Sequence, residues 1–181
     1  MNKKFSISPN IQDYYLLAGR IVPYKRYDIV IKAFNKLGLK LKVVGSGYGL
    51  SELKKLATSD KIEFIGRVLD KELTKLLSRC RALIFPALED FGIIPLEAMA
   101  AGRPVVAYGQ GGARETIKPG ITGEFFQEQT VDSLVQAIKN FKPEKYNPQE
   151  IRQHAKQFDK KIFKNKIISF INKHTTNQTQ I

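Results

Sequence analysis

The sequence predicts an α/β fold built on a doubly wound parallel sheet. Short apolar runs of strand length alternate with segments of helical period through most of residues 12–141. The runs are continuously apolar rather than alternating, which is typical of strands that are buried on both faces. Regular alternation of strands and helices therefore indicates parallel strands, joined by helices that cover both sides of the sheet.

Five strands are expected from their uninterrupted apolar residues. They lie at residues 15–18, 41–44, 62–65, 82–85 and 104–107.

Four helices are expected between these strands. The first begins at Asp28, which can act as its N-cap, and ends before the glycine at position 38. The next two lie at residues 51–57 and 70–80. A short fourth helix is entered through Pro95, because proline suits the first helical position.

The chain changes in character from residue 143 onward. Residues 150–173 are expected to form one helix, with lysines over much of its surface and apolar positions at Ile151, Phe158, Ile162, Phe163, Ile167 and Phe170. We divide the chain into a linker remnant at 1–11, an α/β domain at 12–141, a helical extension at 142–174 and a frayed tail at 175–181.

Composition excludes several classes of protein. The 181 residues give room for one ordinary domain, and a hydrophobic fraction of 43% excludes a disordered chain. No apolar stretch approaches the ~20 residues of a membrane-spanning helix. The single cysteine, Cys80, excludes a disulfide framework and is expected to be small buried filler. A reducing compartment, and hence a cytoplasmic location, is expected.

The charge is strongly basic, with a formal net charge of +13. Such a chain could attract an anionic ligand, nucleic acid or an anionic membrane surface, although dispersed lysines are commonly just solvated. Of the 30 basic residues 22 are lysines, whereas base-edge readout favours arginine. Nucleic acid is therefore disfavoured. Peripheral contact with an anionic membrane, at its inner face, stays open.

In sheets of this kind ligands bind beyond the carboxyl ends of the strands. The loops after Ala18, Val44, Ile65, Phe85 and Ala107 are therefore the candidate site.

The loop after the first strand carries two spaced cations behind a glycine. Gly19 would let a ligand approach the backbone, and Arg20 and Lys25 could neutralise a diphosphate. The alternative is that both cations are solvated. The glycine turn at residues 45–49 is a weaker signal, because Leu50 stands where the dinucleotide fingerprint has its third glycine.

The stretch from Glu89 to Glu97 is the most informative one. Its two carboxylates stand eight positions apart across a strand-to-helix turn. If Pro95 opens the helix, Glu97 lies in the first turn, and the free amides around residues 91–94 form an anion site. The carboxylates would accept hydrogen bonds from sugar hydroxyls. The alternative is a plain helix start, with Glu97 near the positive end of the dipole.

Other candidate motifs are weaker. The pair Gly111-Gly112 could present amides to an anion or form only a tight turn. One cysteine and two separated histidines, His154 and His174, do not make a zinc site. No Asp-x-Asp pair is present to hold a metal diphosphate, so no metal is expected.

In order and spacing these segments resemble the C-terminal donor domain of family 4 retaining glycosyltransferases. The resemblance covers about residues 14–173. Its motifs are Gly19-Arg20 with Lys25, Phe64-Ile65-Gly66-Arg67, Phe85-Pro86-x-x-Glu89-Asp90-Phe91-Gly92, the run from Glu97 to Ala107, Gly111-Gly112-x-x-Glu115-Thr116, and His154-Ala155 with Phe158.

The resemblance implies one half of a GT-B architecture, in which two Rossmann-like domains face each other across a cleft. The C-terminal domain binds the nucleotide-sugar and the N-terminal domain binds the acceptor. By position, Arg20 and Lys25 would hold the diphosphate, and the backbone near Arg67 and Val68 would contact the base. Glu97 would accept hydrogen bonds from the ribose hydroxyls.

The resemblance also assigns the sugar end of the site. Glu89 would contact the donor sugar and is the candidate catalytic residue. The amides of Phe91, Gly92 and Ile93 would approach the sugar and its phosphate. The pattern is most similar to mannosyltransferase-like members, which implies GDP-mannose as the donor and a glycan or lipid-linked acceptor.

Family members carry an N-terminal acceptor domain of similar size, which these residues do not include. We therefore expect the isolated chain to be inactive, with apolar residues of the last helix partly uncovered. Two alternatives stay open. One is a non-catalytic nucleotide-sugar-binding module that acts with a separate acceptor subunit. The other is a basic protein that binds nucleic acid or an anionic membrane.

Overall fold

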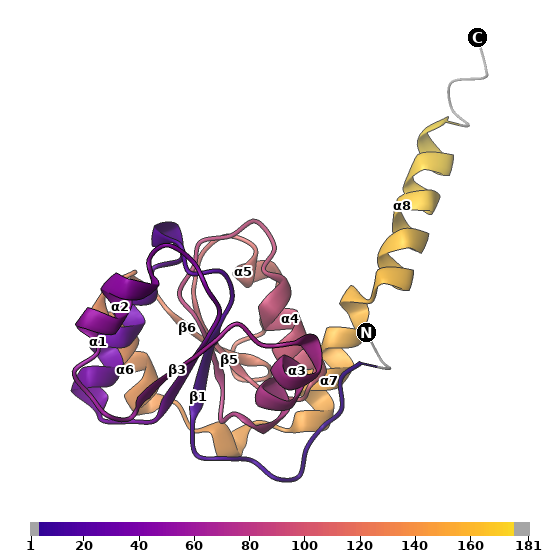
Figure 1. Cartoon of the computed structure of the whole chain (residues 1–181). Coiled ribbons are helices and arrows are strands. Elements are labelled where there is room, and N and C mark those ends of the chain that lie inside the picture. The colour runs from indigo at the N-terminus through magenta and orange to yellow at the C-terminus, as the bar shows by residue number, and fades with distance from the viewer. Residues whose placement is uncertain (1–3, 176–181) are drawn as a thin grey trace.

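A six-stranded, all-parallel sheet forms the centre of the molecule in the computed structural model, which describes residues 4–175 (Figure 1). The strand order is β3-β2-β1-β4-β5-β6, the order of the Rossmann fold. The strands are β1 (Tyr15–Ala18), β2 (Leu41–Val44), β3 (Ile62–Gly66), β4 (Leu83–Phe85), β5 (Val105–Tyr108) and β6 (Gly123–Phe126). The predicted doubly wound parallel sheet is confirmed.

The five predicted strands agree with the structure to within one residue at either end. The sixth, β6, was not predicted. It pairs in parallel with β5, from Val105 opposite Gly123 to Tyr108 opposite Phe126. Its four residues include a glycine and Glu124, and only its two end residues are buried, so it lacks the continuous apolar run that marks the inner strands.

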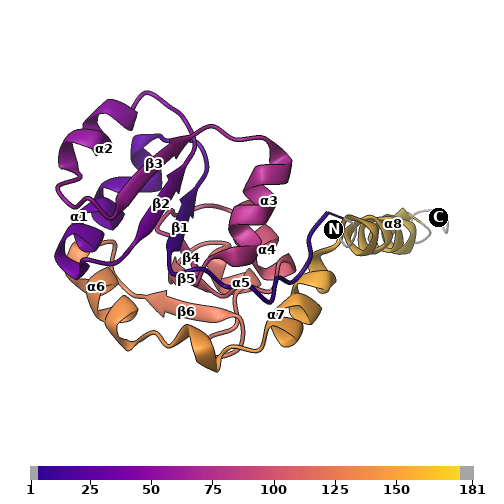
Figure 2. The ribbon, with the colours of Figure 1, turned by 60° about the horizontal axis from the view of Figure 1, so that its bottom comes forward.

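Helices cover both faces of the sheet (Figure 2). One face carries α1 (Tyr27–Leu37), α2 (Leu50–Leu56) and α6 (Val131–Asn140), and the other carries α3 (Asp70–Arg79), α4 (Ile93–Ala100), α5 (Ala113–Thr116) and α7 (Pro148–Ala155). Each face has its own hydrophobic cluster. Phe34 and Leu134 are fully buried on the first face, and Leu77 and Met99 on the second.

The expected N-cap of the first helix, Asp28, is wrong, because the cap lies two residues earlier, at Arg26. A 3-10 turn, η1 (Pro23–Lys25), leads almost directly into α1, which begins at Tyr27. Arg26 occupies the capping position with a φ of 52°, and no side chain caps this end. Asp28 instead lies inside the first turn, where its carboxylate pairs with the Arg26 guanidinium at 3.1 Å.

The single helix expected over residues 150–173 is two helices. After α7 come a 3-10 turn, η3 (Lys156–Phe158), and then α8 (Lys160–Thr175), while η2 (Pro143–Lys145) precedes α7. Asp159 breaks the helix, because its backbone is extended and its carboxylate accepts a hydrogen bond from the Lys161 amide at 3.0 Å. Apolar periodicity continues across this break, so the pattern alone does not reveal it.

Helix α8 projects away from the sheet and buries none of its side chains against it (Figure 1). Phe163 and Phe170 are 63% and 62% exposed, and Ile162 and Ile167 are also exposed. The expected uncovering of these residues is confirmed. Thr175 is the last residue of α8, and the rest of the expected tail lies outside the described residues.

The N-terminal segment, expected to be a linker remnant, contributes to the core. Phe5 is only 4% exposed and belongs to the cluster that holds Leu76 and Leu77 of α3. The domain boundaries themselves stay predictions. Within residues 4–175 no helix combines the length and the apolar character that crossing a bilayer requires.

Candidate functional site

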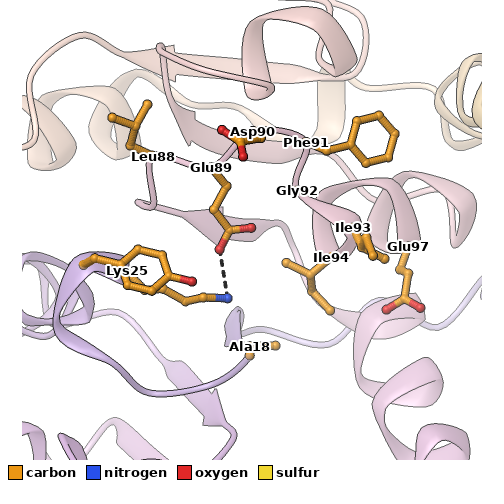
Figure 3. A pocket seen from close by; sticks show the side chains of 12 residues that line it. Ala18, Lys25, Leu88, Glu89, Asp90, Phe91, Gly92, Ile93, Ile94 and Glu97 are labelled. Atoms are coloured by element: carbon orange, nitrogen blue, oxygen red, sulfur yellow. Dashed lines mark ion pairs between the residues drawn. The ribbon is translucent and has the colours of Figure 1, made fainter.

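The main candidate site is a cavity of about 610 Å³ where β1 and β4 lie side by side at the centre of the sheet. The helices that follow these two strands, α1 and α4, cover opposite faces, so this is the topological switch point at which such sheets bind ligands. Residues 18–19 and 24–25 line the cavity from the β1 side, and residues 88–94 and 97 line it from the β4 side (Figure 3).

A lysine and a glutamate meet inside this cavity. Nζ of Lys25, at the end of η1, lies 2.9 Å from Oε1 of Glu89, which follows β4 (Figure 3). The two side chains are only 16% and 21% exposed. The contact is an ion pair whose angles do not make a hydrogen bond, so Oε1 accepts none. Attraction between these charges is less screened by water than in a surface pair.

A buried tyrosine lies near the same pair. Burial raises the pKa of Tyr27, and the negative charge of Glu89 raises it further. The phenol therefore stays neutral across the physiological range.

Two hydrogen bonds to backbone carbonyls hold the segment that carries Glu89 in place. Gly112 donates its amide to the Glu89 carbonyl at 2.8 Å, and Gln129 donates its side-chain amide to the Pro86 carbonyl at 2.8 Å. A Cβ atom on Gly112 would lie 2.1 Å from the Asp90 carbonyl oxygen, so only glycine fits there. The glycine pair forms a turn in which the Gly112 amide is already used, and the alternative that this turn also presents amides to an anion stays a prediction.

Helix α4 begins at Ile93, two residues before the expected position. Gly92 precedes it with a φ of 77°, and no side chain caps the first amides. Pro95 fits at the third position because the first turn has no intrahelical N–H partners to lose. Glu97 is therefore the fifth residue, and the first turn holds no acidic side chain. The expected place of Glu97 in the first turn, on which both interpretations of this stretch depended, is wrong.

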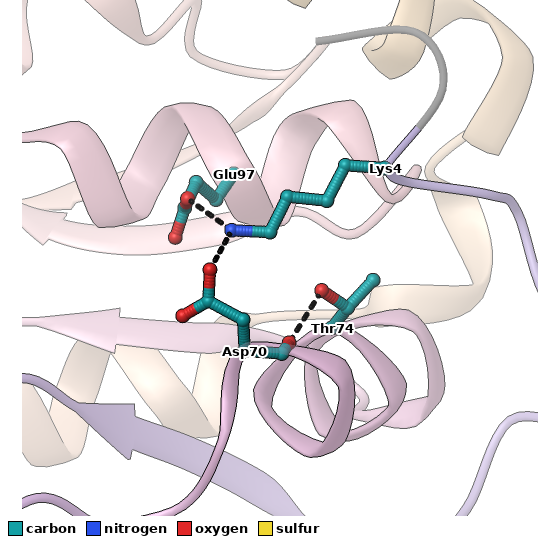
Figure 4. Close-up of polar contacts among 4 residues, drawn as sticks. All are labelled: Lys4, Asp70, Thr74 and Glu97. Atoms are coloured by element: carbon teal, nitrogen blue, oxygen red, sulfur yellow. Dashed lines mark hydrogen bonds and ion pairs between the residues drawn. The ribbon is translucent and has the colours of Figure 1, made fainter.

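Glu97 also lines the cavity, apart from the Lys25–Glu89 pair (Figure 3), and it contacts a lysine that is not part of the lining (Figure 4). Nζ of Lys4 is 3.7 Å from Oε1 of Glu97 and 2.9 Å from Oδ2 of Asp70, the first residue of α3. The Glu97 side chain is 18% exposed. Its burial raises the pKa of this carboxyl, the positive charge of Lys4 lowers it, and the negative charge of Asp70 raises it.

Most of the residues singled out in the sequence line the cavity, namely Gly19, Lys25, Glu89, Phe91, Gly92, Ile93 and Glu97. Three others do not. Arg20 and Arg67 are exposed and do not line it, and Val68 packs against the hydrophobic cluster that includes residues of α3 and α4. The roles assigned to all ten residues stay predictions.

Sequence reasoning missed several residues of the site. Tyr24 and Leu88 line the cavity and are more than half exposed. Each adjoins a predicted residue in sequence, which is the signal that could have indicated them. Lys4 has no such signal, because only the folded path of the N-terminal segment brings it to Glu97.

Comparison with known proteins decides the family. The family described as Glycosyl transferases group 1 matches residues 2–158. The chain belongs to the group 1 glycosyltransferases. It is 35% identical over 135 residues to a GDP-mannose-dependent monoacylated alpha-(1-6)-phosphatidylinositol monomannoside mannosyltransferase of Corynebacterium glutamicum, which covers 66% of this chain and 35% of that protein.

Solved structures of other proteins share the fold of this group 1 glycosyltransferase. Sucrose-phosphate synthase from Thermosynechococcus elongatus superposes with a TM-score of 0.83 at 21% identity, over 97% of this chain and 51% of that one. HepE of Anabaena, in complex with UDP-glucose, gives a TM-score of 0.76 at 23% identity, over 91% and 49%. The chain spans half or less of the length of the curated relatives it matches.

Two features of the site bear on the chemistry that it can support. The Lys25 cation and the uncapped start of α4 favour an anion. The carboxylates of Glu89 and Glu97 can accept hydrogen bonds from hydroxyl groups. Within residues 4–175 no cluster of three His, Cys, Asp or Glu side chains is arranged to hold a metal ion. The expectation that no metal takes part stays a prediction.

Proposed function

We propose that this chain is the nucleotide-sugar-binding half of a retaining hexosyltransferase. The observation that carries the proposal is the cavity at the β1–β4 switch point, where Lys25, two carboxylates and the start of α4 converge. A cation beside free helix amides suits a diphosphate, and carboxylates suit the hydroxyls of the two sugars that flank it. Membership of the group 1 glycosyltransferases supports the same assignment.

The proposed ligand lies along the segment from Glu89 to Glu97. Glu97 holds the ribose, Glu89 contacts the donor sugar, and the diphosphate lies between them, against Lys25 and the amides of residues 91–93. Arg20 adds a second cation from the exposed end of its loop. The base would reach outward to the backbone of residues 67–68. Because these two residues lie outside the cavity, this part of the proposal depends on the family resemblance alone.

The proposed reaction breaks the bond between the anomeric carbon of the donor sugar and the diphosphate oxygen. A bond to an acceptor hydroxyl oxygen forms on the same face of the sugar, and the hydroxyl proton passes to the departing diphosphate oxygen. Negative charge develops on the departing diphosphate. Lys25, Arg20 and the first amides of α4 would stabilise that charge, while Glu89 adjoins the reacting sugar.

We propose mannose from GDP-mannose as the donor. The mannosyltransferase of Corynebacterium glutamicum, named as GDP-mannose-dependent, supports this choice. UDP-glucose is the competing donor, because HepE binds it on the same fold. The acceptor would be a glycan or a lipid-linked sugar. A cytoplasmic location and peripheral contact with an anionic membrane stay predictions from the cysteine count and the lysine content.

Calorimetric titration with GDP, UDP, GDP-mannose and UDP-glucose at two salt concentrations tests the proposal. A formed pocket should prefer one base and depend only weakly on salt, whereas nucleic-acid binding falls steeply as salt rises. Failure of all four ligands to bind would reject the donor-half assignment. A preference for UDP-glucose would keep the assignment and reject GDP-mannose.

The chain alone should transfer no sugar at a useful rate. Alignment of acceptor and donor by a facing domain supplies roughly 7–11 kcal/mol of the barrier in well-oriented reactions. We propose that such an acceptor domain packs on the exposed apolar side of α8. Acceptor-dependent turnover by the purified chain would contradict this. Activity that appears only on mixing with an acceptor-domain protein would support a split enzyme, and binding without turnover in that mixture would favour a non-catalytic module.

A further inference from the structure

We propose that Lys4 is a positioning residue, which holds the Glu97 carboxylate charged and oriented toward the ribose of a bound nucleotide. The inference rests on the proposed function, since it assigns Lys4 a part in the same site.

Three separate elements meet at this contact (Figure 4). Lys4 belongs to the N-terminal segment, Asp70 opens α3, and Glu97 lies in α4. The ammonium group lies between the two carboxylates, at 2.9 Å from Asp70 and 3.7 Å from Glu97. Glu97 lines the donor cavity, whereas Lys4 and Asp70 do not. Lys4 thus contacts a carboxylate of the cavity lining without itself belonging to that lining.

The backbone beside Lys4 is fixed by its neighbour. Phe5 is almost completely buried in the cluster formed by α3, α4 and the adjoining strands. A lysine on a free terminus would pay the full entropy cost of ordering its side chain and its backbone. Burial of Phe5 removes the backbone part of that cost, so the contact with Glu97 can persist although Lys4 itself is partly exposed.

The charges around Glu97 make Lys4 the group that opposes its protonation. Burial and the charge of Asp70 both raise the pKa of the Glu97 carboxyl, and Lys4 lowers it. The other charged residues that line the same cavity are Lys25, Glu89 and Asp90. Loss of Lys4 should therefore shift Glu97 toward its protonated form. A protonated carboxyl is a weaker acceptor for ribose hydroxyls than a carboxylate.

Four variants separate this role from a structural one. Lys4→Ala removes the compensating charge, and Lys4→Arg keeps it. Asp70→Asn removes the carboxylate that competes with Glu97 for Lys4, so that Glu97 is the only carboxylate left in contact with the Lys4 ammonium group. Lys71→Ala is the matched control, because it removes an exposed lysine next to Asp70 that does not line the cavity. Circular dichroism at each pH confirms that every variant stays folded over the range used.

The measurement is the Kd for GDP and for UDP between about pH 4.5 and 8. Affinity should fall as pH drops through the pKa of Glu97, because the carboxylate form binds. Lys4→Ala should move this fall to higher pH by about half a unit or more. A roughly two- to fivefold loss that persists at neutral pH, where Glu97 is ionised in both proteins, would come from the lost orientation of the carboxylate. Asp70→Asn should move the fall in affinity to lower pH. Lys4→Arg and Lys71→Ala should leave it in place.

A second readout keeps the inference separate from the proposed function. Carbon-13 NMR of the Glu97 carboxyl in the ligand-free chain should show its pKa raised by Lys4→Ala and lowered by Asp70→Asn. An unchanged Glu97 pKa in both variants would overturn the role of Lys4. Tighter nucleotide binding by Lys4→Ala would overturn it too, since Lys4 would then compete with the ligand. If the unmodified chain binds neither nucleotide, the proposed function fails, and this NMR titration still decides the coupling.

Discussion

The two ends of the segment from Glu89 to Glu97 each pair a glutamate with a lysine, but in different ways. Glu89 and Lys25 form a short, mostly buried pair inside the cavity, with both charges facing the space of a ligand. Glu97 meets Lys4 at a longer distance, and Lys4 is shared with the exposed Asp70 outside the cavity. At the Glu89 end, the lysine contacts one carboxylate only, and we call this the closed pair. At the Glu97 end, the lysine is shared between two carboxylates, and we call this the shared contact.

The difference decides what a ligand must displace. On the proposed assignment, a diphosphate that binds Lys25 would have to draw it away from Glu89. Lys4 does not line the cavity, so on the same assignment a ribose would bind Glu97 without displacing Lys4. Removing one partner of a buried pair leaves an uncompensated charge, whereas an exposed, shared pair contributes little to stability.

The largest effect is expected from removal of both proposed diphosphate cations. Replacement of Arg20 and Lys25 together by alanine should weaken nucleoside-diphosphate binding by about 1.5–3 kcal/mol for each charged hydrogen bond lost, before non-additivity. Calorimetry on the double variant measures it. The control replaces Lys32 and Lys54, exposed lysines of α1 and α2 that do not line the cavity. Unchanged affinity in the Arg20–Lys25 variant would remove both residues from the site.

The next effect concerns the shared end of the segment. Glu97→Ala should weaken the bare diphosphate and the intact nucleotide-sugar alike, because the ribose is common to both ligands. The expected loss is about 1.5–3 kcal/mol, or roughly ten- to a hundredfold in Kd. A melting curve on the same variant shows whether the fold is intact. Full affinity for both ligands would show that the ribose lies elsewhere.

The closed end should respond to only one of the two ligands. Glu89→Ala should weaken the nucleotide-sugar and leave the bare diphosphate nearly unaffected, because only the former carries a sugar to contact Glu89. The variant also frees Lys25 for the diphosphate, so no loss is expected there. Titration of both ligands against Glu89→Ala and Glu97→Ala under the same conditions gives the comparison. Equal losses at Glu89 for both ligands would reverse the assigned orientation of the donor.

The sequence predicted most of the sheet and the centre of the site because both leave local signals. Inner strands are continuously apolar, and parallel topology puts the ends of β1 and β4 at one edge, which brings Lys25 to Glu89. The edge strand β6 has no such run. The break at Asp159 was missed because apolar spacing continues past it, although its own side chain caps α8.

Contacts that depend on the folded path could not be predicted. Proline statistics placed the start of α4 at Pro95, but the left-handed backbone at Gly92 begins the helix earlier and carries Glu97 into the second turn. Lys4 reaches Glu97 only because Phe5 is buried against α3 and α4. Nothing in the local pattern of residues 4–10 indicates that burial. Sequence reasoning therefore found the carboxylates and one lysine partner, and missed the other.

The smallest effect, none at all, is expected from removal of divalent metal. Glu89 faces Lys25, Glu97 shares Lys4 with Asp70, and residues 4–175 hold no cluster of three side chains that could ligate a metal ion. Two cations and the first amides of α4 would carry the diphosphate charge, since helix N-termini bind phosphate without an ion. The Kd for GDP and UDP should then be the same with excess chelator as with added magnesium. A collapse of affinity in chelator would show that a metal, and not Lys25 with Arg20, neutralises the diphosphate.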